Sequence, residues 1–397
     1  MIKSQVTGLI SLDNYATNKI YNEFMKILVV TTKNFNPGDD FIREGLMKLL
    51  SNLDIDIEYE YFDKHTPTFT NFRIVGRTKY LNWRVTRYIY KIINIFNQNY
   101  LESFDAVIHS GAPFFYDSKN IFRFNTYSSE WFLNLYRGRN SKKIKKLFLI
   151  AIGSNLFKNE KSEDLINSKK IARTIDSLKK IKLGLITARD PETYEILEKQ
   201  DLHPLLLPCT AFFCSSASYG GSEINDGDYV IFNYMKYGII KKGNSNTNVQ
   251  EWEKVAKEVV EDISKNFKVL VLSHSKQDYL DCLKTFPDQE HFYSKNYQDY
   301  FDVYENSIAG IYNRVHGAML SLSNLKPTIL ISADSRKSMF CMFDFPVYKI
   351  NEVSSEKIIY SFKELISEKE SFSKYLTKLK ETNQDIYLNE LQKNLLS

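Results

Sequence analysis

Short apolar runs, separated by segments with helical periodicity, make up most of the chain from Met25 onward. The runs are rich in Val, Ile, Leu and Phe, which is typical of strands that are buried on both faces of a parallel sheet. Their alternation with helical segments is the pattern of β-α units. The pattern therefore predicts an α/β protein built on parallel sheets.

The apolar runs fall into two series. The first comprises residues 26–31, 55–62, 105–111, 146–153 and 183–189. The second comprises residues 229–235, 268–273, 308–312, 328–332 and 347–350. A chain of 397 residues exceeds the size at which a single hydrophobic core usually stops growing. We therefore expect two Rossmann-like domains.

The domain boundaries are predicted from changes in composition. Residues 214–228 are rich in Ser, Gly and Asp, which is typical of an interdomain linker. The N-terminal domain is expected at 25–213 and the C-terminal domain at 229–350. Residues 351–397 are charged, with apolar residues at helical spacing, and predict terminal helices packed across both domains. Residues 1–24 precede the first strand and are interpreted as an N-terminal extension.

Composition and charge argue against several classes of protein. A net charge of +5 is mild for this length and gives no indication of a nucleic-acid partner. The four cysteines lack the spacing of a zinc site, and no metal-binding constellation is visible. No apolar run reaches the roughly 18 residues of a membrane-spanning helix, and the N-terminus lacks the apolar core of a signal peptide. We expect a cytoplasmic protein with reduced thiols and no metal.

The loop after the first strand is a candidate ligand site, because ligands of open α/β sheets bind outside the carboxyl ends of the strands. It has the sequence NFNPGDD, residues 34–40, and a helical pattern follows. Gly38 would permit close approach to the backbone, and Asp39 could hold or deprotonate a sugar hydroxyl. An aspartate here is equally well explained as the N-cap of the helix.

Other strand ends of the first series carry His109, Gly111 and Arg189. His109 could contact an acceptor, although a lone histidine is more often structural, and Gly111 again leaves the backbone accessible. Arg189 would face a cleft between the domains, or it is an ordinary surface arginine. The Asp190-Pro191 pair that follows is typical of the start of a helix.

The most informative local sequence is IYNRVHGAMLSL, residues 311–322, where an apolar strand is followed by a helix of small residues. Strand alternation could place Arg314 and His316 on one side. Arginine makes paired hydrogen bonds to carboxylate or phosphate, histidine exchanges a proton near neutral pH, and Gly317 leaves room for a ligand. The alternative is an arginine–carboxylate ion pair beside a helix-capping histidine.

Together these elements resemble the polysaccharide pyruvyl transferase family over residues 25–350. The most specific match is the Arg-x-His element followed by an apolar helix and a strand that begins after proline. The matching segments are NPGDDFI, the strand end at Gly111, ARDPETYEIL, HSKQDY from His274, and NRVHGAMLSLSNLKPTILIS.

The resemblance implies a GT-B-like pair of domains that transfers the pyruvyl group of phosphoenolpyruvate (PEP) to two hydroxyls of a glycan sugar, forming a pyruvate ketal in cell-surface polysaccharide biosynthesis. PEP would be the donor substrate, and no cofactor is implied. The C-terminal domain would hold the donor, and the N-terminal domain the acceptor. The implied residues are Arg314 and His316 at the donor, Arg189 as a helper, Gly38 and Asp39 at the acceptor, and Arg336 or Lys337 as a further cation.

The chemistry of this reaction suits these residue types. His316 is the candidate general acid, and Asp39 is a candidate base. The segment LPCTAF, residues 207–212, departs from the family, whose members often carry an Asp-Pro pair where Cys209-Thr210 stands. The departure leaves open whether the transferred group is the same. A GT-B glycosyltransferase that uses a nucleotide sugar and a noncatalytic glycan-binding protein are the alternatives.

Residues 64–101 contain seven lysines and arginines and no Asp or Glu. Cationic and aromatic residues recur there at near-helical spacing, among them Trp83, Arg84 and Arg87. Such a surface suits anionic lipid head groups and would bring the enzyme to a lipid-linked glycan at the inner face of the cell membrane. The alternative is a solvated basic face whose aromatic residues pack inward.

Overall fold

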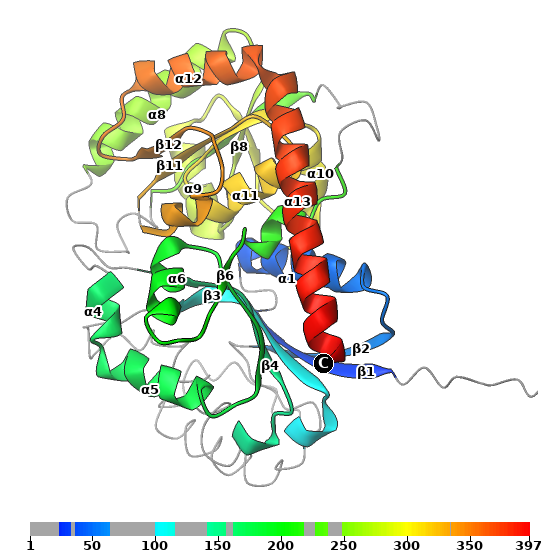
Figure 1. The fold of residues 1–397 in the computed structure, drawn as a ribbon. Coiled ribbons are helices and arrows are strands. Elements are labelled where there is room, and N and C mark those ends of the chain that lie inside the picture. The colour runs from blue at the N-terminus through cyan, green and yellow to red at the C-terminus, as the bar shows by residue number, and fades with distance from the viewer. Residues whose placement is uncertain are drawn as a thin grey trace, which may run out of the picture.

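The computed structural model describes two parallel sheets of six strands each, which lie one above the other in Figure 1. None of the helices in the described part of the chain is long and apolar enough to cross a membrane. The described residues are 24–32, 36–63, 100–115, 141–155, 162–217, 227–236, 248–333 and 335–397.

The first sheet has the strand order β2-β1-β3-β4-β5-β6. All five strands predicted for the first series are present, whereas the two-residue strand β6 was not predicted. The strands are β1 (Met25–Thr31), β2 (Ile57–Asp63), β3 (Ala106–Phe115), β4 (Leu147–Ser154), β5 (Leu183–Ala188) and β6 (Leu205–Leu206). The accompanying helices are α1 (Pro37–Ser51), η1 (Leu101–Ser103), η2 (Ser141–Lys143), α4 (Ser162–Ile166), α5 (Lys169–Leu178), α6 (Pro191–Glu198) and η3 (Thr210–Phe213).

The second sheet has the order β12-β11-β10-β7-β8-β9, which is the Rossmann order 3-2-1-4-5-6 when counted from β7. The short strand β9 was not predicted. The strands are β7 (Tyr229–Asn233), β8 (Val269–Leu272), β9 (Glu290–Phe292), β10 (Ser307–Tyr312), β11 (Thr328–Ser332) and β12 (Val347–Lys349). The helices are α8 (Val249–Ser264), α9 (Lys276–Thr285), α10 (Asp299–Glu305), α11 (Val315–Ser323), η4 (Ser335–Phe340), α12 (Ser355–Ser367) and α13 (Lys369–Leu396).

Strand β1 shows why the strands read as continuous apolar runs. Ile27 and Val29 pack into one core and Leu28 and Val30 into another, and all four are fully buried. Residues of α1 and α13 belong to the first core, and residues of α5 and α6 to the second. Because both faces of the sheet are covered, neither face of the strand carries polar residues.

The core beneath α1 continues from the first sheet into the second without a break. Phe41 of α1 is fully buried, and its ring centroid lies 6.0 Å from His274, 6.2 Å from Tyr300 and 5.6 Å from Phe301. Burying a phenylalanine contributes about 1.5–3 kcal/mol. The N-terminal sheet is therefore joined to the C-terminal one through an aromatic pocket that receives a side chain of α1.

Helix α13 packs along both domains and appears as the long red helix in Figure 1. In the N-terminal domain its Tyr387 donates a hydrogen bond to the carbonyl of Pro208 at 2.9 Å. Helix α12 packs against α8 and β11 of the C-terminal domain. The expected terminal helices are present, and α13 is the one that spans the two sheets.

Three sequence predictions concern residues outside the described part of the chain. They are the extension 1–24, of which only Phe24 is described, the centre of the linker at 218–226, and the basic segment 64–101 except for Tyr100 and Leu101. These stay predictions.

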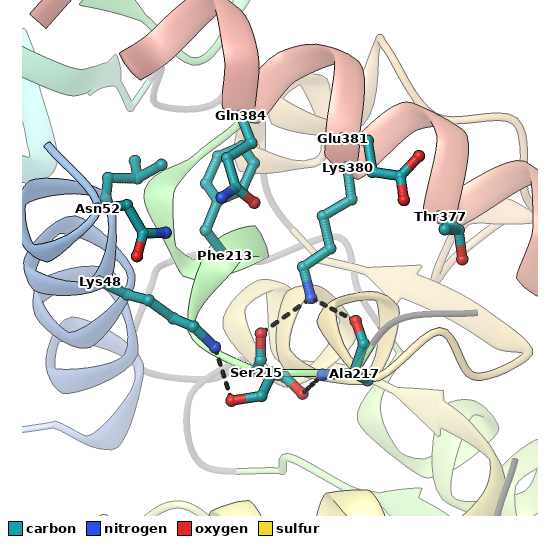
Figure 2. A pocket seen from close by; sticks show the side chains of 11 residues that line it. Lys48, Asn52, Phe213, Ser215, Ala217, Thr377, Lys380, Glu381 and Gln384 are labelled. Carbon is teal, nitrogen blue, oxygen red and sulfur yellow. Dashed lines mark hydrogen bonds between the residues drawn. The ribbon is translucent and has the colours of Figure 1, made fainter. Parts of the chain in front are cut away.

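A pocket of about 260 Å³ lies between α1, η3 and α13 (Figure 2). Lys380 of α13 is only 7% exposed there and donates hydrogen bonds to the carbonyls of Ser215 at 2.9 Å, Ala217 at 3.2 Å and Ser323 at 2.9 Å. Burial lowers the pKa of Lys380 to about 8. One ammonium group thus links α13 to the chain that leaves the first domain and to the end of α11.

Replacing Lys380 with methionine should lower the free energy of unfolding by about 1–3 kcal/mol, because the carbonyls lose a buried donor while the apolar stem is kept. The control is Lys378→Met, since Lys378 is exposed on the same helix. Urea unfolding of both variants measures the effect, and equal stabilities would show that the Lys380 contacts contribute nothing.

Candidate active site

The candidate site lies at the carboxyl end of the second sheet, between β7 and β10, where the strand order reverses. Two buried asparagines fix the backbone there. Asn233, at the end of β7, donates to the carbonyl of Leu272 at 2.8 Å and accepts from the backbone N–H of Arg314 at 3.0 Å. Asn313 donates to the carbonyl of Ile331 at 2.9 Å. Helix α11 therefore begins in the crevice where open α/β sheets bind ligands.

Arg314 and His316 do not lie on a strand, so the expected strand alternation is wrong. Strand β10 ends at Tyr312, Arg314 is the N-cap of α11, and His316 is its second residue. The backbone turns into the helix before either side chain, and the two side chains consequently have different partners.

The Arg314 guanidinium pairs with a buried carboxylate. Its Nη2 donates to Oδ2 of Asp278, and the side chain is 25% exposed. The same oxygen of Asp278 accepts a hydrogen bond from Ser275 Oγ at 2.7 Å, and Ser275 is the N-cap of α9. The ion pair considered from sequence is thus present, and the charge of Arg314 is partly neutralised.

His316 lies against the N-terminal domain although it belongs to the C-terminal one. It is 6% exposed, and its Nε2 lies 3.4 Å from Nη1 of Arg189. Its other edge faces Gly38, where a Cβ atom would stand 2.6 Å from Nδ1. Gly38 therefore has a clear role: a side chain at this position would collide with the imidazole.

Arg189 is a buried cation at the end of β5, 2% exposed. Its Nη1 donates to Cys209 Sγ at 3.7 Å, and its Nη2 is buried with no hydrogen-bond partner among the residues that the structure describes. Among the same residues, no carboxylate lies within ion-pair distance of the Arg189 guanidinium. Burying an uncompensated charge is costly. This environment favours binding of an anion.

The neighbouring carboxylate, Asp190, is used elsewhere. It accepts from the backbone N–H of Thr193 at 2.8 Å, as the N-cap of α6, and from that of Ser154 at 2.9 Å. A Cβ atom on Gly153 would stand 2.5 Å from Nε of Arg189 and 2.6 Å from Oδ2 of Asp190. Gly153 is thus a site residue that was not on the candidate list, since a glycine at a strand end is a weak signal by itself.

His274 is a second histidine beside the site. Burial, and then the charge of Arg314, lowers its pKa to about 3, so the imidazole is neutral. Its Nε2 lies 3.1 Å from the hydroxyl of Tyr304. A Cβ on Gly317 would stand 2.9 Å from that hydroxyl. Gly317 therefore makes room for these aromatic residues.

Neither aspartate of the first loop is the N-cap of α1, so the N-cap interpretation is wrong. The N-cap of α1 is Asn36, whose Oδ1 accepts from the N–H of Gly38 at 3.3 Å. Asp39 lies in the first helical turn and is partly exposed. Asp40 is buried and pairs with Arg43 at 2.5 Å. Asp39 thus follows Gly38 in the first turn of α1.

The remaining predicted residues have other neighbours than Arg189 and His316. His109 is buried in β3, and its ring centroid lies 5.2 Å from that of Phe114 in an edge-to-face arrangement. Gly111 has a positive φ of 39°, and a Cβ there would stand 2.4 Å from Ile42 of α1, which indicates a packing role. Arg336 and Lys337 lie partly exposed on η4.

Comparison with known proteins identifies the family. The polysaccharide pyruvyl transferase family matches over residues 36–335, most of the chain. The chain belongs to this family. Its family membership makes it a transferase. A comparison with curated proteins found no match.

Solved structures of sugar-nucleotide enzymes share the fold. S. aureus MnaA, solved with UDP, is 13% identical with a TM-score of 0.54, over 89% of this chain and 91% of that one. The UDP-GlcNAc 2-epimerase of Neisseria meningitidis, bound to UDP-GlcNAc, is 13% identical with a TM-score of 0.55, over 93% and 100%. At this identity the likeness establishes the fold alone, and that fold is of the GT-B type.

The departure at Cys209-Thr210 lies inside the site of this transferase. Cys209 is fully buried beside Arg189, and Thr210 donates from Oγ1 to the carbonyl of Ile42 at 2.8 Å. Cys209 therefore offers a thiol, and not a carboxylate, to Arg189.

The stability of the protein should fall as the pH is lowered from about 6.5 to about 3. The pKa of His274 is 6.5 in the unfolded chain and about 3 in the folded one, so the unfolded chain binds an extra proton in this window. The free energy of unfolding then falls by up to about 1.4 kcal/mol per pH unit.

The contribution of His274 is isolated by comparing variants in urea unfolding at several pH values. His274→Gln should show a flatter pH dependence than the wild type, whereas His203→Gln, which changes an exposed histidine, should not. Equal pH dependence in the wild type and His274→Gln would contradict the assignment of a neutral His274.

Proposed function

We propose that this transferase moves the pyruvyl group of PEP onto two hydroxyls of a glycan sugar to form a pyruvate ketal. The observation that carries the proposal is Arg189, a buried guanidinium that lies 3.4 Å from His316 and has no carboxylate partner among the described residues. A site with a deficit of negative charge suits a small, highly charged donor. PEP, with a carboxylate and a phosphate on three carbons, is such a donor.

Two arginines from different domains divide the recognition of the donor. Arg189 offers an unused Nη2, and Arg314 offers a guanidinium that is partly exposed and already paired with Asp278. Arg189 therefore interacts more strongly with an anion than Arg314 does. The imidazole of His316, between the first turn of α1 and Arg189, is placed next to the bound donor.

The residues suffice for a balanced reaction. His316 gives a proton to the methylene carbon of PEP, which leaves positive charge on the carbon that carries the phosphate. The first sugar hydroxyl adds to that carbon and loses its proton to Asp39. Phosphate then leaves, and the second hydroxyl adds to the same carbon and passes its proton to the departing phosphate, which closes the ketal. Gly38 and Asp39 form the acceptor side of the site.

A nucleotide-sugar donor is the alternative, because the two solved structures with this fold contain UDP or UDP-GlcNAc. A diphosphate would also suit Arg189 and Arg314. Turnover assays with PEP and with UDP-sugars separate the two functions, and binding of a glycan without turnover of either would indicate a noncatalytic protein.

The proposal includes a lipid-linked acceptor and contact of the basic segment 64–101 with anionic head groups at the inner face of the membrane. Its support is the charge pattern of the sequence. Failure of the protein to sediment with anionic vesicles at low salt would remove this part and leave the transferase function unchanged.

Substitutions at Arg189 and His316 should separate binding from chemistry. Arg189→Lys should weaken PEP binding by about 10-fold or more, because an ammonium lacks the paired donors of a guanidinium. His316→Gln should reduce kcat by about 100-fold or more with a smaller effect on affinity.

Calorimetry and steady-state kinetics measure the two effects, with circular dichroism to confirm folding. Lys378→Gln, at an exposed site on α13, is the control. Wild-type affinity in Arg189→Lys, or wild-type turnover in His316→Gln, would remove that residue from its role.

A further inference from the structure

The contact between Arg189 and His316 determines where the imidazole carries its proton. A guanidinium is always protonated, and each of its nitrogens donates. At 3.4 Å from Nη1 of Arg189, the Nε2 of His316 can therefore only accept. The ring proton is then on Nδ1, and the imidazole is neutral. A general acid that is neutral in the free protein must gain a proton before it can deliver one from Nε2.

The surrounding charges agree with a neutral imidazole in the donor-free protein. Arg189 at the end of β5 and Arg314 at the N-cap of α11 are both cations, and the second is paired with Asp278. His274, beside Gly317, is itself neutral because burial and Arg314 lower its pKa to about 3. Asp39 is the carboxylate in the α1 turn next to Gly38, and it is partly exposed.

The other titratable groups on described elements packed against α11 have partners of their own or are neutral. Asp40 on α1 is paired with Arg43. The pKa values of the Tyr304 and Tyr312 hydroxyls are raised by burial, so both are neutral. Lys380 of α13 contacts the carbonyl of Ser323 at the opposite end of the helix. Among the described residues, the contact that the structure gives to Nε2 is the one with the guanidinium of Arg189.

An anionic donor reverses this arrangement. An oxygen that binds Arg189 compensates its charge. It also offers a hydrogen-bond acceptor to Nε2, whereas the guanidinium offered a donor. Such an oxygen stabilises the imidazolium. We propose that binding of the donor loads His316 with a proton from solvent, so that the general acid is formed only when the donor is in place.

This inference rests on the proposed function and extends it to the order of proton transfers. One proton moves from solvent to Nε2 as PEP binds. The same proton passes to the methylene carbon during addition of the first hydroxyl, and the imidazole is neutral again. The hydroxyl proton leaves through Asp39. The site therefore begins and ends each turnover with His316 in the same state.

Calorimetry of PEP binding in the absence of acceptor tests the inference with the full chain. The titration is run at about pH 8, where the phosphate, whose second pKa is about 6, is fully ionised. The measured enthalpy is compared in two buffers that differ in enthalpy of ionisation, which gives the number of protons taken up. We expect uptake approaching one proton per PEP for the wild type.

Two glutamine variants assign the proton. His316→Gln keeps an acceptor for Arg189 but cannot titrate, so it should bind PEP without proton uptake. His203→Gln changes an exposed histidine and should take up protons like the wild type. If His316→Gln does not fold, NMR of the imidazole Cε1 signals of the wild type gives the same test, since one of the six histidines should become cationic on addition of PEP.

The outcomes distinguish the inference from the function on which it rests. Binding of PEP with equal enthalpy in both buffers would overturn the inference and leave the proposed function intact. Proton uptake that persists in His316→Gln would overturn it as well. Absence of PEP binding to the wild type would overturn the proposed function and the inference together.

Discussion

The site depends on the apolar core that the two domains share. Phe41 of α1 enters the aromatic pocket formed by His274, Tyr300 and Phe301, and α13 packs along both sheets. Arg189 belongs to the first sheet and His316 to the helix that follows β10 of the second. They meet at 3.4 Å because these apolar contacts set the distance between the domains. The geometry of the candidate site is thus a product of interdomain packing.

Charge is distributed unevenly over the two arginines. Arg314 has a buried carboxylate partner, Asp278, whose position is fixed by the N-cap of α9. Arg189 has a thiol and an imidazole as neighbours, and one nitrogen without a partner among the described residues. Burial of this charge destabilises the folded protein, and the donor of the proposed function would compensate it.

The sequence predicted those parts of the fold that depend on local or periodic patterns of apolar residues. Strands buried on both faces read as apolar runs, and all ten predicted strands are present. The short strands β6 and β9 have too few residues for such a signal. Among the site residues, Gly38, Arg189 and His316 were candidates and lie together. The role of Gly153 was left open by the sequence, because it depends on two side chains 36 and more residues away in the chain.

The errors in the prediction came from local sequences that suit more than one structure. Asp39 and Asn36 both suit an N-cap, and the structure uses Asn36. Arg314 and His316 were predicted at strand positions, but they lie at the start of α11. The contact between Arg189 and His316 joins residues 127 positions apart, and nothing in either local sequence specifies it. Such contacts come from tertiary packing.

The most direct test of this account is a crystal structure of the protein with PEP. We expect an anionic oxygen of PEP within hydrogen-bond distance of Arg189 Nη2 and of His316 Nε2, with Arg314 still paired to Asp278. A structure in which PEP contacts only Arg314, and the contact between Arg189 and His316 is unchanged, would contradict the central claim that the buried charge of Arg189 holds the donor.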